Sequence, residues 1–140
     1  MNQILIDSNI LVYAINRASP KNIKAQMFLQ ENLGKLAVAH QNILESLRIL
    51  THPKFKSPMQ IADAIDAIEN ILKFCKIVCP DYRTRTLTIE LIKKYKLSSD
   101  LILDAYLAAT ALSNDIRELA TDNVKDFKKF REITVINPFQ

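Results

Sequence analysis

The stretch QILIDSNILVYAI, residues 3–15, changes its hydrophobic period in the middle. Residues 3–6 form a short apolar run with the length and composition of a buried strand. DSNILVYAI, residues 7–15, has the spacing of a helix, with Asp7 or Ser8 as its cap. This stretch therefore predicts a buried strand that leads directly into a helix.

The same alternation continues along the chain. Further strands are predicted at residues 35–40 (KLAVAH), 76–80 (KIVCP), 118–121 (ELAT) and 133–137 (ITVIN). Helices are predicted at residues 23–33, 41–50, from the Ser57–Pro58 cap to Cys75, from an Asp81 cap to Tyr95, and from a Ser99 or Asp100 cap onward, with a short helical or turn segment at 123–130. Because crossovers between parallel strands need covering layers, we predict an α/β fold, a three-layer α/β/α sandwich with a five-stranded parallel sheet, in a single domain over residues 1–140.

Length and composition exclude several classes of protein. A chain of 140 residues with 49% hydrophobic content can bury one core without disulfides, so Cys75 and Cys79 are expected to be free core thiols. No window approaches the ~18 apolar residues of a membrane span, and no charged region with a long apolar run stands at the N-terminus. We therefore expect a cytoplasmic protein with no membrane contact.

Glycine and histidine are scarce. Gly34 is the single glycine, which excludes glycine-rich phosphate-binding loops, and neither His40 nor His52 lies in a Ser/His/Asp or Cys/His pattern. The net charge of +4 favours a polyanionic partner, although charge alone is equally consistent with a mildly basic protein of ordinary lysine-rich surface. Acidic side chains are therefore the main candidates for catalysis or metal binding.

One acid interrupts an apolar helix. In LSSDLILDAYLAATALSND, residues 97–115, Asp104 lies one turn from Leu101, Leu107 and Ala108. An uncompensated buried charge costs several kcal/mol. Asp104 therefore requires a partner cation, a hydrogen-bond cluster or a bound metal.

Other acids are predicted to lie at the same edge of the sheet. Asp7 follows the first strand, Asp122 follows the fourth, and Glu45 lies one helical turn beyond the second. Parallel strands ~4.8 Å apart direct their carboxyl ends to one edge, so these acids and Asp104 can converge. Such an all-oxygen set suits Mg²⁺ or Mn²⁺ and phosphodiester chemistry. Each acid also has a structural alternative: Asp7 as a helix cap, Glu45 paired with Arg48, and Asp122 in a turn.

Five segments carry a family resemblance: ILIDSNILVYA, NILESLRIL, DAYLAATAL, LATDNVKDF and VINPF. From Ile4 to Phe139 the chain resembles PIN-domain ribonucleases, specifically VapC-type toxins of bacterial toxin–antitoxin pairs. RILTHPKFKSP also resembles the proline-bearing connection of one branch of those toxins. The resemblance implies a PIN-like sandwich, Mg²⁺- or Mn²⁺-dependent cleavage of RNA, a homodimer, and neutralisation by a cognate antitoxin.

The resemblance also implies roles for particular residues. Asp7, Glu45 and Asp104 match three acids of the family pattern, as catalytic residues and metal ligands. Asp122 is our candidate for the fourth, with Asn123 and Asp126 as alternatives. The supporting residues are Ser8 and Asn9 beside the first acid, and Thr121 and Asn123 beside the fourth.

Two other classes of function fit part of this pattern. A PIN-like module could bind RNA or protein without cleaving, but three intact acids argue against that. A Mg²⁺-dependent phosphatase or receiver-like switch could use Asp7 as its nucleophile or phosphoacceptor. That class needs a lysine beyond a late strand, and none follows ITVIN.

Overall fold

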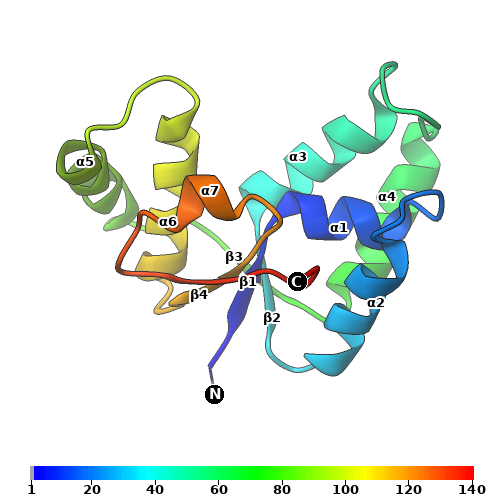
Figure 1. Ribbon diagram of the computed structural model, residues 1–140, viewed down its shortest axis with the longest axis horizontal. Coiled ribbons are helices and arrows are strands. Elements are labelled where there is room, and N and C mark those ends of the chain that lie inside the picture. Colours follow the sequence, from blue (N-terminus) through cyan, green and yellow to red (C-terminus); the bar gives the residue numbers. More distant parts are fainter. Residues whose placement is uncertain (1) are drawn as a thin grey trace.

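Five strands form a single parallel sheet in the computed structural model, which describes residues 2–140 (Figure 1). Their order across the sheet is β3-β2-β1-β4-β5, and each neighbouring pair runs parallel. The strands are β1 (Ile4–Ile6), β2 (Leu36–Ala39), β3 (Lys76–Val78), β4 (Glu118–Ala120) and β5 (Thr134–Ile136). The predicted α/β class and five-stranded parallel sheet are confirmed.

Helices cover both faces of this sheet (Figure 1). One face carries α1 (Ser8–Ile15), α2 (Asn22–Glu31), α3 (His40–Thr51) and α4 (Ile61–Leu72), and the other carries α5 (Thr84–Tyr95), α6 (Leu101–Ser113) and the short α7 (Val124–Phe127). The predicted three-layer arrangement is therefore confirmed.

A hydrophobic core lies on each face of the sheet, and β1 contributes side chains to both, because successive side chains of a strand point to opposite faces. Ile4 and Ile6 pack in the core beneath α1 to α4, whereas Leu5 packs against α5 and α6. Burial on both faces is the reason that this strand is a continuous apolar run rather than an alternating one.

Two predicted helix caps, Ser57 and Asp81, are wrong, whereas Asp100 is the N-cap of α6 as predicted. The helix after residue 57 begins at Ile61, because the backbone N–H of Met59 donates to the Leu50 carbonyl and holds the preceding segment against the end of α3. Asp81 does not cap α5. A turn follows Asp81 and α5 begins at Thr84, while the Asp81 carboxylate accepts a hydrogen bond from the backbone N–H of Arg83. At α6 the N-cap is Asp100, but its side chain makes no capping bond.

The two thiols are free, as predicted, but they are not both in the core. Cys75 is half-buried, and burial raises its pKa to about 11. Cys79 is exposed because it follows the edge strand β3. Within residues 2–140 every helix is too short or too polar to cross a membrane.

Candidate metal centre

The sheet reverses its order between β1 and β4, and a cavity of about 220 Å³ opens near the carboxyl ends of these strands. In parallel sheets this reversal leaves a crevice in which ligands bind. Asp7, Glu45 and Asp104 line the cavity together with Ser8, Asn9 and Asn123. The structure thus gathers three of the four predicted acids and three of the four predicted supporting residues around one space.

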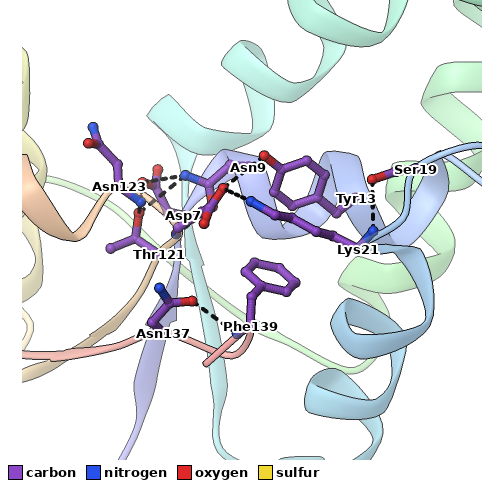
Figure 2. Close-up of polar contacts among 10 residues, drawn as sticks. Asp7, Asn9, Tyr13, Ser19, Lys21, Thr121, Asn123, Asn137 and Phe139 are labelled. Atoms are coloured by element: carbon purple, nitrogen blue, oxygen red, sulfur yellow. Dashed lines mark hydrogen bonds and ion pairs between the residues drawn. The ribbon is translucent and has the colours of Figure 1, made fainter.

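Within residues 2–140 the groups that donate hydrogen bonds to Asp7 are all neutral, and Figure 2 shows Asp7 beside two of them, Asn9 and Thr121. It is the N-cap of α1, is only 7% exposed, and accepts the backbone N–H of Ser8 at 2.8 Å. Thr121 Oγ1 donates at 2.7 Å, and the amides of Asn42 and Asn9 donate at 3.2 and 3.3 Å. Burial raises the pKa of Asp7, while the bonds from Thr121 and Ser8 oppose that rise. The Asp7 carboxylate therefore both caps α1 and lines the cavity.

Glu45 is joined to Asp7 through Ser8. Ser8 Oγ donates to Glu45 Oε1 at 2.8 Å and lies 3.4 Å from Asp7 Oδ1. Among residues 2–140 the ion pairs do not include the alternative pair of Glu45 with Arg48. Glu45 is instead half-buried and faces the cavity.

Asp104 lies in the first turn of α6 and is half-buried. Within the described chain its carboxylate has no hydrogen bond and no Lys or Arg partner. Burial raises the pKa of Asp104 to about 6, and the charges of Asp126, Asp7 and Glu45 add to the rise. The charge of Lys129 opposes this rise in pKa, but within residues 2–140 Asp104 forms no ion pair and accepts no hydrogen bond.

Asp122 is not among the residues that line this cavity. Lys21 Nζ is 2.6 Å from its Oδ2, and the Tyr13 hydroxyl donates to the same oxygen at 2.9 Å. Lys21 also lies over the rings of Tyr13 and Phe139, at 5.1 and 5.2 Å from their centroids. Burial alone would raise the pKa of Asp122, but Lys21 and Tyr13 hold it below its usual value. Its placement does not support the predicted role as fourth ligand.

The two alternatives for the fourth position lie closer to Asp104. Asn123 lines the cavity, and its side-chain amide donates to Asp126 Oδ2 at 2.9 Å. Asp126 carries the charge with the largest effect on the pKa of Asp104. Thr121 joins this segment to Asp7, because its Oγ1 also accepts the backbone N–H of Asn123 at 2.9 Å.

The sequence analysis missed Asn42, whose side chain is fully buried beside Asp7. Its Oδ1 has no hydrogen-bond partner within residues 2–140. The available signal was spacing: Asn42, Ser46 and Leu50 recur every four residues, so they form one row on α3. All three are buried, and two of them are polar.

The donor set fits a hard divalent cation. The polar lining of the cavity consists of carboxylates, the Ser8 hydroxyl and the amides of Asn9, Gln41 and Asn123, and none of the described residues that line it is Lys, Arg, His or Cys. In the arrangement seen across residues 2–140, no three His, Cys, Asp or Glu side chains could by themselves hold an ion. Mg²⁺ usually keeps several waters and takes one or two protein carboxylates, so a complete protein cage is not required.

The fold and the cavity define an α/β protein with a carboxylate site at the strand ends. The family model described as PIN domain matches residues 4–133. The chain belongs to the PIN-domain family. No curated protein sequence matches it.

Solved structures share this fold over nearly the whole chain. A chain of a toxin–antitoxin complex from Klebsiella pneumoniae has a TM-score of 0.72 at 21% identity, covering 99% of both chains. A chain of DNA-bound VapBC from Salmonella typhimurium has a TM-score of 0.74 at 14% identity, again with 99% of each chain covered. VapC20 from Mycobacterium tuberculosis, a toxin that cleaves the sarcin–ricin loop, gives 0.71 at 10% identity over 91% of this chain and 95% of that one.

Proposed function

We propose that this chain is a metal-dependent endoribonuclease and the toxin of a VapBC-type toxin–antitoxin pair. The observation that carries the proposal is the cavity lined by Asp7, Glu45 and Asp104, acids with which no Lys or Arg of residues 2–140 forms an ion pair. Membership of the PIN-domain family supports it, as do neighbours described as VapBC complexes and as a toxin that cleaves the sarcin–ricin loop.

Asp7, Glu45 and Asp104 would hold Mg²⁺ or Mn²⁺, with Asn123 and Asp126 beside them. When bound, such an ion supplies Lewis-acid activation of water and neutralises charge on the phosphodiester oxygens. The chain contributes a fixed first carboxylate, because four neighbours donate hydrogen bonds to Asp7. Ser8 orients Glu45, whereas Asp104 keeps its oxygens free for a ligand.

The proposed partners are RNA, a cognate antitoxin and a second copy of the chain, in the cytoplasm. Large apolar side chains remain exposed on α4, on β3 and in the segment between them, including Ile61, Phe74 and Ile77. Exposed apolar patches of this kind mark protein interfaces. A basic antitoxin side chain at the acids would neutralise them as a metal does, and inhibition by an antitoxin without any basic residue would contradict that role.

The test is cleavage of a mixed RNA substrate by the purified chain with Mg²⁺, with Mn²⁺ and with a chelator. We expect endonucleolytic products with metal, none with the chelator, and none from Asp7→Asn with metal. Cleavage that survives the chelator would refute metal dependence. RNA binding without any cleavage would instead identify a non-cleaving PIN-like module.

A further inference from the structure

A second cavity, of about 280 Å³, adjoins the first along the same edge of the sheet. It lies at the ends of β2 and β3, between α3 and α6. We name it the Tyr106 cavity, and its walls include His40, Gln41, Leu44, Pro80, Tyr106 and Thr110. Gln41 lines both cavities, so the two cavities are neighbours.

The two helices that carry the acids also carry this cavity. Gln41 precedes Glu45 by four residues on α3, which places the two side chains on the same face. Tyr106 follows Asp104 by two residues on α6. Because both helices are rigid elements, a group in the Tyr106 cavity would be held at a fixed position relative to the acids.

The Tyr106 cavity combines an aromatic ring with unused hydrogen-bonding capacity. Tyr106 is half-buried, and Leu44 and Pro80 add apolar surface beside it. Gln41 Oε1 is buried and has no hydrogen-bond partner within residues 2–140, while its Nε2 reaches the Leu103 carbonyl only at 3.5 Å. A buried polar atom without a partner is costly, so a ligand that supplies a donor would be favoured.

We propose that the Tyr106 cavity binds a nucleobase of single-stranded RNA, next to the phosphodiester at the acid-lined cavity. The inference rests on the proposed function and extends it to base recognition. Single-stranded RNA is recognised by stacking on aromatic side chains and by hydrogen bonds to base edges, and the Tyr106 ring and the Gln41 amide offer both.

The charge of the cavity favours a base over other ligands. None of the described residues that line it is Asp, Glu, Lys or Arg. A phosphate or an acidic peptide would find no Lys or Arg partner there, and a basic antitoxin side chain would be drawn to Asp7, Glu45 and Asp104 next door. A neutral, flat group with N–H donors fits what remains.

The experiment compares a short single-stranded RNA with an abasic ribose-phosphate oligomer of equal length, both carrying fluorescein. Binding is measured by anisotropy in a chelator, so that no cleavage occurs. We expect Tyr106→Ala to lower the preference for RNA over the abasic oligomer by about 5- to 150-fold, the range for loss of one stacked base. Tyr106→Phe keeps the ring and should keep the preference.

Tyr82→Ala is the matched control, because Tyr82 is 88% exposed and lies outside the Tyr106 cavity. It should bind both oligomers as the wild type does. Melting curves establish that each variant is folded, and Tyr106→Leu replaces Tyr106→Ala if the latter does not fold.

Two results would overturn the inference. One is a wild-type preference for RNA that Tyr106→Ala leaves unchanged. The other is an unchanged RNA affinity together with weaker binding of a protein inhibitor, which would make the cavity a protein-docking site. RNA binding that depends on Tyr106, without metal-dependent cleavage, would refute the proposed function but keep this inference. Metal-dependent cleavage together with a preference for RNA that Tyr106→Ala leaves unchanged would refute this inference but keep the proposed function.

Discussion

At the scale of single residues, Asp104 is the carboxylate whose environment most needs a ligand. Asp104→Asn should abolish RNA cleavage, a loss of at least about 100-fold, because the proposed metal site loses one of its carboxylates. In the metal-free protein the variant should be at least as stable as the wild type, since an acid whose pKa is raised to about 6 is replaced by a neutral amide. Cleavage rates and unfolding in a chelator measure both effects.

Asp100→Asn is the control for Asp104→Asn, because Asp100 is an exposed carboxylate next to the same helix and makes no capping bond. It should leave both cleavage and stability unchanged. An active Asp104→Asn that is destabilised by several kcal/mol would instead indicate a buried cationic partner.

The same carboxylate predicts a pH dependence for the metal-free protein. The pKa of Asp104 rises from 3.8 in a free side chain to about 6 when folded, so the folded chain binds this proton more tightly than the unfolded chain. Its contribution to stability is complete below pH 3.8 and is lost as pH rises through about 6. After allowance for solvent screening of a half-buried group, we expect a loss of roughly 1 kcal/mol.

Denaturant unfolding at pH 5 and pH 7.5 in a chelator, for wild type and Asp104→Asn, isolates this contribution. The stability of Asp104→Asn relative to the wild type should increase as pH rises, because only the wild type loses the contribution of the protonated carboxyl. A difference that does not change with pH would show that Asp104 titrates at its ordinary pKa.

At the scale of elements, Thr121 joins the end of β4 to the end of β1. Thr121→Val removes a 2.7 Å bond to the Asp7 carboxylate and two further bonds, from the Asn9 amide and the Asn123 backbone. Hydrogen bonds to charged groups contribute about 1.5–3 kcal/mol, so we expect destabilisation near 2–3 kcal/mol in denaturant unfolding.

Thr88→Val provides a matched comparison. Thr88 is also buried and also donates a 2.7 Å bond, but to the neutral carbonyl of Thr84 within α5. Its loss should cost only about 1 kcal/mol. Equal costs for the two variants would mean that the Asp7 carboxylate is not charged when the protein is folded near neutral pH.

The segment after β4 holds two acids with different surroundings. Asp126→Asn should lower the pKa of Asp104 toward its ordinary value and weaken Mn²⁺ binding, because Asp126 is the main charge acting on Asp104. Asp122→Asn should change neither, since its carboxylate is bound by Lys21 and Tyr13. Carboxyl NMR titration and Mn²⁺ titration measure these effects, and the opposite ranking would restore Asp122 as the fourth ligand.

At the scale of the whole molecule, metal binding should stabilise the fold. A ligand at 100 times its Kd that binds only the folded state contributes about 2.7 kcal/mol. For a domain of this size that corresponds to a rise in Tm on the order of 10 °C. Thermal unfolding with and without saturating Mn²⁺ measures it; Asp104→Asn should show a much smaller rise, and no rise in the wild type would contradict a metal site.

The sequence by itself determined the parallel α/β sandwich, because hydrophobic period is a local property. The run Ile4–Ile6 and the helical spacing after Asp7 were sufficient to predict the first strand and helix. The positions of Asp7, Glu45 and Asp104 followed, since parallel strands and the helices after them meet at one edge.

Only the tertiary structure decided which polar groups meet across that edge. Asp122 lies two residues after the end of β4, and the sequence cannot show that Lys21, 101 residues away, binds it. Asn42 could not be separated from other polar helix residues until α3 was packed against Asp7. Hydrogen bonds and ion pairs depend on distances of about 3 Å between residues that can be far apart in sequence, whereas hydrophobic period depends only on neighbouring residues. The fold could therefore be predicted from the sequence, but the partners of the charged side chains could not.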